Sequence, residues 1–208
     1  ARTIAESGAH VVCLQEVDAD DDHLGLLLKR LGPQWRGGAG PSRFGRSAAV
    51  LSRVGGEFFG EQVHDYSFGA AGVRLAMAGG EVEILSIHLA PVRNAGLRAL
   101  EAKWLADYAA GSQVPVILAG DTNLAPESAW DRLSSLFTDD LELDRVSVSL
   151  LESVGRDVGA GGVATGLPAR RIDRVFVPGA LAVSEYEVLF GKERGRMDHR
   201  PVRVRLSL

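Results

Sequence analysis

The chain of 208 residues carries repeated short, mostly apolar runs separated by polar and glycine-rich stretches. Such runs are typical of strands, and they occur at residues 11–15, 47–52, 73–77, 82–89, 114–118, 172–177, 183–190 and 202–206. The runs at 11–15 and 47–52 are continuous enough to predict strands that are buried on both faces. The pair Gly79-Gly80 lies between two of the runs and predicts a hairpin.

Helical periodicity is confined to a few segments. Residues 1–9 are typical of the end of a helix that closes at Gly8, and His23 to Leu31 predicts an amphipathic helix ended by Gly32-Pro33. Two more helices are predicted at Leu97–Tyr108 and Ala129–Phe137. Residues 37–45 are expected to form a loop, and residues 138–168 to be mostly irregular.

Many strands with few helices, joined by both hairpins and helical connections, indicate an α+β protein. Two sheets packed face to face, with helices on the outer faces, would accommodate these elements. No linker is long enough to divide the chain, so we expect a single domain over residues 1–208.

Composition supports a soluble globular domain, with 46% hydrophobic and 24% charged residues. The single cysteine, Cys13, lies in an apolar run; we expect a buried, inert thiol and a cytoplasmic location. No run approaches the roughly 18 apolar residues of a membrane span, and residues 1–6 do not resemble a secretory signal. The first residue is Ala1 rather than Met, so we expect the natural chain to begin upstream.

The net charge of −4 disfavours a protein that coats nucleic acid, without excluding a nuclease with a local basic rim. Either a phosphate-binding cleft or solvated surface would explain the basic clusters at Arg43/Arg46, Arg170/Arg171/Arg174 and Lys192/Arg194/Arg196.

Polar residues with chemical potential lie at the ends of the predicted strands: Glu16, His88, Asp121, Asn123, Asp198 and His199. Taken singly, each acidic residue is more typical of a cap or turn, and a lone histidine in a strand is more typical of a core residue whose ring nitrogens are hydrogen-bonded. Together they offer carboxylate, carboxamide and imidazole groups. Hard divalent ions such as Mg²⁺ need only one or two protein carboxylates, and the imidazoles then remain available for phosphate oxygens or proton transfer.

Five motifs in this order resemble those of the endonuclease/exonuclease/phosphatase superfamily, over residues 4–205. They are Val12-Cys13-Leu14-Gln15-Glu16-Val17, Ser86-Ile87-His88-Leu89, Gly120-Asp121-Thr122-Asn123, Arg171-Ile172-Asp173-Arg174-Val175 and Asp198-His199-Arg200-Pro201-Val202. The resemblance implies the DNase I-like fold, a four-layer α/β/β/α sandwich of two mixed β-sheets. It also implies a Mg²⁺-dependent phosphoric ester hydrolase, with Mn²⁺ as a second candidate ion.

The same resemblance implies roles for individual residues. Glu16 and Asp198 would lie on the metal side of the site. Asp121 would position or deprotonate the attacking water, and Asn123 would orient that water or bind a phosphate oxygen. His199 would contact the scissile phosphate with Asp173 orienting its imidazole, and His88 would be a second phosphate donor. The substrate-binding candidates are Arg46 and Arg171.

The sequence also departs from the family pattern. The family begins with a strand that carries a metal-binding Asn, and nothing before Ala1 supplies it, so we expect this first strand to be missing before residue 1. Met197 stands where Ser is common, and Thr122 where an aromatic residue is frequent.

The expected function is hydrolysis of a phosphate mono- or diester by in-line attack of an activated water. One alternative is a catalytically weak or inactive binding protein that retains the fold. Within the enzyme interpretation, a nuclease is the alternative to a lipid or small-molecule phosphodiesterase or phosphatase. We expect a monomer whose partner is a phosphate-ester substrate, with nucleic acid disfavoured by the net charge.

Overall fold

The computed structural model describes residues 1–18, 22–41, 45–61, 69–91, 94–124, 140–160, 162–166, 170–189 and 199–207. The helices are α1 (Arg2–Ser7), α2 (His23–Leu31), α3 (Ala95–Gly111) and α5 (Asp140–Val154). The strands are β1 (Val11–Asp18), β2 (Arg36–Ala39), β3 (Arg46–Ser52), β4 (Glu57–Glu61), β5 (Ala70–Met77), β6 (Gly80–His88), β7 (Val116–Asp121), β8 (Arg156–Asp157), β9 (Asp173–Val177), β10 (Ala182–Val188) and β11 (Val202–Ser207).

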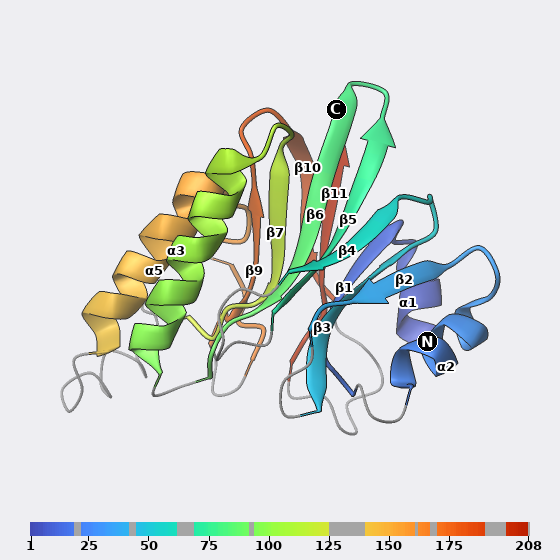
Figure 1. Cartoon of the computed structure of the whole chain (residues 1–208), viewed down its shortest axis with the longest axis horizontal. Coiled ribbons are helices and arrows are strands. Elements are labelled where there is room, and N and C mark those ends of the chain that lie inside the picture. Colours follow the sequence, from blue (N-terminus) through green and yellow to red (C-terminus); the bar gives the residue numbers. More distant parts are fainter. Residues whose placement is uncertain are drawn as a thin grey trace.

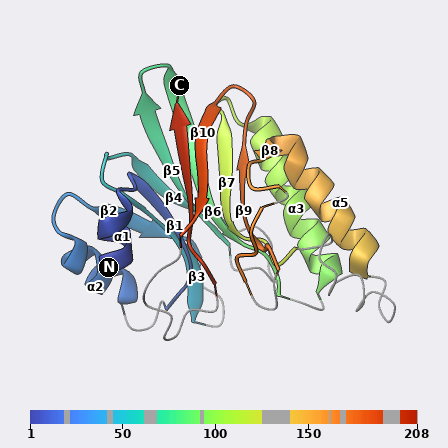
Figure 2. The same cartoon turned by 180° about the vertical axis from the view of Figure 1, so that it is seen from behind.

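Four layers follow one another across the molecule (Figure 1). Helices α3 and α5 cover one face of a mixed six-stranded sheet of order β4-β5-β6-β7-β9-β8, in which β6 and β7 run parallel. The next layer contains the antiparallel sheets β1-β3-β2 and β10-β11, and α1 and α2 form the outer layer. Seen from behind, β10 and β11 lie over the six-stranded sheet (Figure 2). The expected α/β/β/α sandwich is confirmed.

Three apolar clusters fill the three interfaces between these layers. Leu85, Ile87, Leu118 and Phe176 pack with Leu105 and Leu151 of the α3–α5 layer. The interior between the sheets contains Val50, Val73, Val82, Ile117 and Val177. A smaller cluster joins Leu51 and Trp35 to the apolar face of α2. Alternate residues of one strand thus enter different clusters, which is the period-two pattern of a sheet covered on both faces.

Several predicted boundaries are confirmed, because they depend on local capping chemistry. Helix α1 ends where Gly8 adopts φ 69°, and α2 begins and ends at the predicted residues, with Asp22 accepting from the Gly25 N–H. The hairpin of β5 and β6 also forms as predicted, with Met77 opposite Gly80.

The prediction that residues 138–168 are mostly irregular is wrong, because α5 occupies Asp140–Val154. This helix is stabilised by packing on α3 and on β7, β8 and β9, with Leu151 fully buried, rather than by a strong local signal. The predicted loop at 37–45 is also wrong in part, since β2 pairs with β3 through Gly37 and Gly38. A Cβ on Gly37 would lie 2.6 Å from the Leu51 side chain, so close packing explains this glycine-containing strand.

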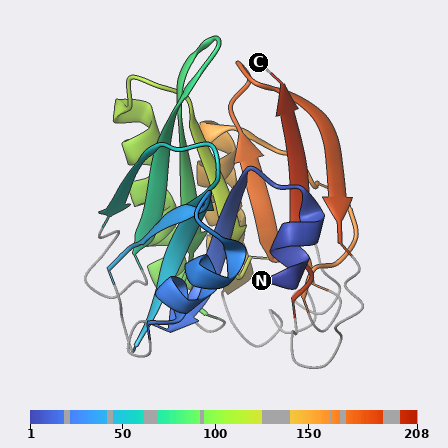
Figure 3. The same ribbon diagram turned by 90° about the vertical axis from the view of Figure 1, so that its right-hand side faces the viewer.

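Burial on both faces is confirmed for β3 but not for β1. Residues Ser47 to Ser52 are buried, whereas those of β1 are half-buried apart from the exposed Glu16. Strand β1, which follows α1 along the chain (Figure 3), lies at the edge of its three-stranded sheet, and an edge leaves side chains partly accessible. Burial nevertheless raises the pKa of the Cys13 thiol to about 12, opposed by a hydrogen bond with Ser86, as expected for an unreactive cysteine.

Other expectations concern segments outside this description. The predicted helix at 129–137 and its Trp130 lie outside the described residues, as does Asp198. Among the described helices, none combines the length and apolar character that crossing a bilayer requires. The neighbouring phenylalanines Phe58 and Phe59 pack against the two largest apolar clusters.

Candidate active site

Three expected site residues meet at one end of the six-stranded sheet. His88 ends β6 and pairs in register with Asp121, which ends β7, and Asp121 pairs with Asp173 at the start of β9. Val82 and Ile84 precede His88 at even spacings and face the second sheet layer, and Ile117 precedes Asp121 in the same way. Because alternate residues share a face, His88 and Asp121 extend the face between the sheets. The apolar strands therefore position the polar groups at their ends.

A tight backbone arrangement follows Asp121. The Asn123 N–H donates to Asp121 Oδ1 at 2.8 Å, and Asn123 has φ 52° in the left-handed region. Its Nδ2 donates to the Leu89 carbonyl at 3.0 Å, and the Thr122 hydroxyl donates to the Ile172 carbonyl at 2.8 Å. A Cβ on Gly120 would lie 2.0 Å from the Ile87 carbonyl oxygen, so this position requires glycine. The Gly-Asp-Thr-Asn motif thus encodes geometry as well as reactive groups.

Asp121 lies between two imidazoles. Its Oδ2 is 3.6 Å from His88 Nε2 and 4.0 Å from His199 Nε2, and both distances are longer than a direct hydrogen bond. On its other side, His199 Nδ1 lies 3.1 Å from both carboxylate oxygens of Asp173. The expected Asp173–His199 pair is therefore formed, and it leaves Nε2 directed toward Asp121 and the space between the sheets.

Burial dominates the electrostatics of this group. Desolvation, followed by the charge of Asp173, raises the pKa of Asp121 to about 7, although the Asn123 N–H opposes the rise. Desolvation lowers the pKa of His88 to about 4, with the Glu16 charge opposing. His88 is thus neutral near pH 7, where Asp121 is poised between its two protonation states.

A β-bulge brings Glu16 to the same region. The register of β1 against β3 shifts between Leu14 and Val17, and Glu16 adopts φ 56°. Without the shift, Glu16 would follow Val12 and Leu14 toward the helix-covered face. Its charge instead acts on the pKa of both His88 and Asp121, and its carboxylate forms an ion pair with Arg46 at the start of β3. Backbone strain of about 1–2 kcal/mol at a non-glycine residue is typical of functional positions.

Two hydroxyl groups, of Ser86 and Thr165, form hydrogen bonds beside the site that the sequence analysis does not predict. Gln15 Nε2 donates to Ser86 Oγ at 3.0 Å, and that hydroxyl donates to the Leu14 carbonyl at 2.9 Å, which links β1 to β6 just before the bulge. Thr165 Oγ1 accepts the N–H groups of Ile172 and Asp173, at 3.2 Å and 3.0 Å. Gln15 and Asp173 each lie in a motif that resembles the family. The sequence pattern does not show, however, that the hydroxyls of Ser86 and Thr165 bond to neighbouring strands, because these contacts join residues far apart in the chain.

The basic cluster Arg170/Arg171/Arg174 is neither solvated surface nor an open phosphate rim. All three side chains are buried. Arg171 donates to both carboxylate oxygens of Asp157, at 2.9 Å and 2.6 Å, and Arg174 adds a further bond at 2.7 Å. Arg171 is therefore held in a buried ion pair with Asp157, and its expected contact with the substrate stays a prediction. Asp157 itself lies in the segment that was expected to be irregular.

Two parts of the site offer ligands for a metal: the group of Asp121, Asp173 and His199, and the carboxylate of Glu16. Ligand atoms of Asp121, Asp173 and His199 lie within 4.8 Å of one another. Glu16 presents an accessible carboxylate beside them, with 54% of its side chain exposed. Such donors suit a hard divalent ion. The expected metal-side role of Asp198 falls outside the described residues.

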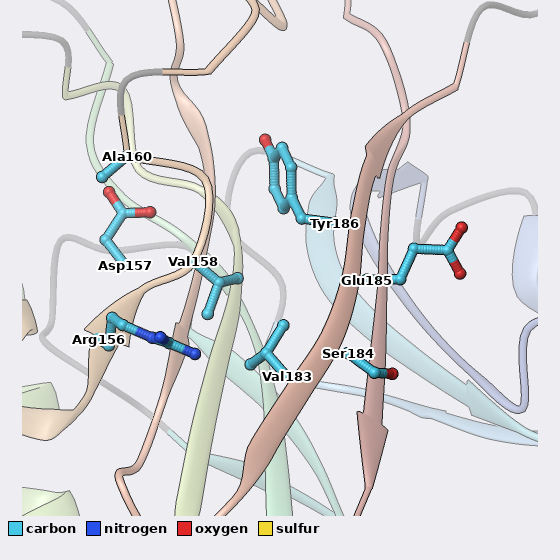
Figure 4. Close-up of a pocket in the computed structure, with 8 residues that line it drawn as sticks. All are labelled: Arg156, Asp157, Val158, Ala160, Val183, Ser184, Glu185 and Tyr186. Carbon is cyan, nitrogen blue, oxygen red and sulfur yellow. The ribbon is translucent and has the colours of Figure 1, made fainter.

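A separate hollow of about 290 Å³ lies between β8 and β10 (Figure 4). It is lined by Arg156, Asp157, Val158, Ala160, Val183, Ser184, Glu185 and Tyr186. None of the expected catalytic residues lines this hollow, so the polar centre at the ends of β6 and β7 is the better candidate for chemistry.

Comparisons with known proteins show the family and the fold of this chain. A profile described as the Endonuclease/Exonuclease/phosphatase family matches residues 1–193. The search of curated proteins finds no match.

Solved structures of low sequence identity share the fold. A family protein from Leptotrichia buccalis superposes with a TM-score of 0.73 at 17% identity, covering 100% of this chain and 90% of that one. A 3'-5' exonuclease from Neisseria meningitidis gives 0.70 at 16%, covering 100% and 93%. A mannosyl-6-phosphatase from Bacteroides thetaiotaomicron gives 0.66 at 17%, covering 100% and 88%. The profile match and the shared fold lead to one conclusion: this chain belongs to the endonuclease/exonuclease/phosphatase family.

Proposed function

We propose that the protein is a divalent-metal-dependent phosphoesterase that hydrolyses a phosphate mono- or diester by in-line attack of an activated water. One observation carries the proposal. A buried carboxylate with a pKa of about 7, Asp121, lies between the imidazoles of His88 and His199, and Asp173 orients the second imidazole. A base whose pKa is close to the working pH is suited to deprotonating water.

The proposed reaction assigns one task to each group. Asp121 takes a proton from the attacking water and holds it on its carboxylate. Asn123 uses one N–H to hold the Leu89 carbonyl, which leaves its Oδ1 and second N–H for the water or a phosphate oxygen. His199, with Asp173 at Nδ1, supplies positive charge or a proton to the phosphate or leaving oxygen from Nε2. His88 acts as a neutral imidazole toward a non-bridging oxygen.

The ion is proposed to be Mg²⁺, with Mn²⁺ as an alternative, held by Glu16 and Asp198. A divalent ion at this place offsets the charge that develops on phosphate oxygens during in-line displacement. The accessible Glu16 carboxylate on its strained bulge fits that role. The group Asp121, Asp173 and His199 is the competing location for the ion. Arg46, which pairs with Glu16, is proposed to contact a phosphate oxygen of the substrate.

The direct test is Mg²⁺-dependent cleavage of bis-p-nitrophenyl phosphate by the natural chain and by Asp121→Ala. We expect the substitution to lower the rate at least about a hundredfold, which is the effect typical of losing a general base. Equal rates for the two proteins would exclude the assigned role of Asp121. The absence of hydrolysis by the natural chain on any phosphate ester would favour the second candidate, a binding protein that retains the fold.

A panel of substrates under the same conditions tests the substrate class. Among the structural neighbours, one is described as a 3'-5' exonuclease and another as a mannosyl-6-phosphatase, so both nucleic acids and small phosphomonoesters belong in the panel. The net charge of −4 favours the lipid and small-molecule esters over nucleic acid, because phosphate backbones bind basic surfaces. Faster turnover of single- or double-stranded DNA than of every small ester would reverse this preference.

A further inference from the structure

Residues 89–91 directly follow the catalytic end of β6, and the first of them bridges two proposed catalytic segments. The Leu89 N–H donates to the Asp121 carbonyl at 2.9 Å. The Leu89 carbonyl accepts Asn123 Nδ2 at 3.0 Å. Leu89 also follows His88 directly. The backbone position of this one residue therefore affects the His88 imidazole and the Asn123 carboxamide together.

Two buried charged side chains hold the next two residues of this 89–91 loop, and a third charged side chain holds one of these two side chains. Glu101 Oε2 accepts the Ala90 N–H at 2.7 Å. Arg98 Nη1 donates to the Pro91 carbonyl at 2.7 Å and to the Ala90 carbonyl at 3.4 Å. Arg98 Nε and Nη2 donate to Oδ1 of Asp144 on α5, at 2.9 Å and 2.7 Å. We name Glu101, Arg98 and Asp144 the loop clamp.

Burial of the loop clamp argues for a positional role. Arg98, Glu101 and Asp144 are exposed by only 2%, 0% and 6%. Desolvating charges is expensive, and apolar residues of similar volume often give an equal or more stable protein. Charged groups that direct several donors and acceptors to one short piece of backbone instead fix its geometry, because each bond has a narrow range of length and angle.

We propose that Glu101, Arg98 and Asp144 are positioning residues that fix the 89–91 loop so that His88 and Asn123 reach the phosphate together. This inference rests on the proposed function of the site. Misplacement of a reacting group by about 1 Å can cost about a hundredfold in rate, so a modest shift of this loop has a large kinetic effect. The clamp carries that constraint from the helical layer, α3 and α5, to the end of β6.

A matched control lies at the other end of the same strand. Glu83 of β6 is exposed by 1%, pairs with Arg74, and accepts the Tyr108 hydroxyl of α3 at 3.1 Å. It is a similarly buried carboxylate that joins α3 to β6. Glu83 lies five positions before His88, a distance of about 16 Å along a strand. Glu83→Gln and Tyr108→Phe therefore report the cost of disturbing the helix–sheet contact without touching the loop.

The experiment compares Glu101→Gln, Glu101→Met, the double variant Arg98→Met/Asp144→Leu and the two controls in the natural chain. The double variant removes both charges of the ion pair, so neither is left buried alone. For each protein we measure urea unfolding, kcat and KM for the best ester of the panel, and hydrogen exchange of the Ala90 amide. Glu101→Gln keeps a side-chain oxygen that can accept the Ala90 N–H, whereas Glu101→Met does not.

We expect Glu101→Met and the double variant to lower kcat about 10- to 100-fold with KM changed less than about threefold, while Glu101→Gln stays within about threefold of the parent. The Ala90 amide should exchange at least about tenfold faster in Glu101→Met than in Glu101→Gln. The control variants should keep the parental kcat whatever their stability.

Three results would overturn the proposal: parental kcat in a folded double variant, equal kcat losses in clamp and control variants of equal stability, or equal losses in the Glu101→Gln and Glu101→Met variants. Exchange of Ala90 does not depend on turnover. If the natural chain hydrolyses no ester, the proposed function fails, and the exchange pattern still decides whether the clamp holds the loop.

Discussion

Replacing Asp121 with Asn should abolish activity and yet stabilise the metal-free protein at neutral and alkaline pH. Asp121 is 6% exposed, and burial together with the Asp173 charge raises its pKa to about 7. Asn is nearly isosteric, keeps an Oδ1 that can accept the Asn123 N–H, and carries no charge to be desolvated. The substitution therefore removes the electrostatic cost of the catalytic group while leaving its main hydrogen bond.

The pKa sets the size and the pH range of this effect. Between pH 3.8 and about 7 the carboxyl is ionised in the unfolded chain but protonated in the folded one, so unfolding releases a proton and stability falls as pH rises. At 1.36 kcal/mol for each pH unit, the loss reaches about 4 kcal/mol by pH 7 and stays constant above it. The stabilisation by Asp121→Asn should be near zero below pH 3.8 and full above pH 7.

Urea unfolding of both proteins in EDTA, from pH 3.5 to 8.5, measures this difference directly. EDTA matters because a bound cation near the carboxylate would lower its pKa and hide the effect. The pH dependence of kcat/KM in the natural chain gives a second reading, since a base with this pKa loses about tenfold in rate for each pH unit below it. A natural chain whose stability relative to Asp121→Asn is the same at pH 4 and pH 8 would refute the reasoning.

Three further predictions concern other parts of the site. Asp157→Ala should lower the free energy of unfolding by about 3–5 kcal/mol, because Arg171 and Arg174 lose their buried partner; a loss below about 1 kcal/mol in urea would contradict this. His88 has its pKa lowered to about 4 by burial, so, relative to His88→Gln, the natural chain should lose about 3 kcal/mol of stability as pH falls from 6.5 to 4. If urea titrations show parallel pH profiles, His88 is not desolvated. Glu16→Gln should weaken Mg²⁺ binding at least about tenfold by calorimetry and reduce the stabilisation that saturating Mg²⁺ gives; unchanged affinity would move the metal to the group of Asp121, Asp173 and His199.

The pattern of residues along the chain predicts the elements whose ends are set by neighbouring residues. Gly32 ends α2 and Gly8 ends α1, because a glycine supplies backbone angles that a helix end requires. The long apolar runs predict β3, β6 and β7, because strands that are covered on both faces need apolar residues along most of their length. Helix α5, by contrast, is stabilised by packing on a sheet assembled from distant segments, and no short window of sequence contains that contact.

The sequence by itself determined which residue types the site contains and placed most of them at strand ends: Glu16, His88, Asp121, Asn123 and, through the recognised motifs, Asp173 and His199. Only the tertiary structure decided the pKa values and the orientation of these groups. Burial between two sheets raises the pKa of Asp121 and lowers that of His88, and a bulge turns Glu16 away from the helix-covered face. It also decided that Arg171 pairs with a buried Asp157. Desolvation and ion pairing depend on neighbours brought together from far along the chain, and a one-dimensional pattern does not contain those distances.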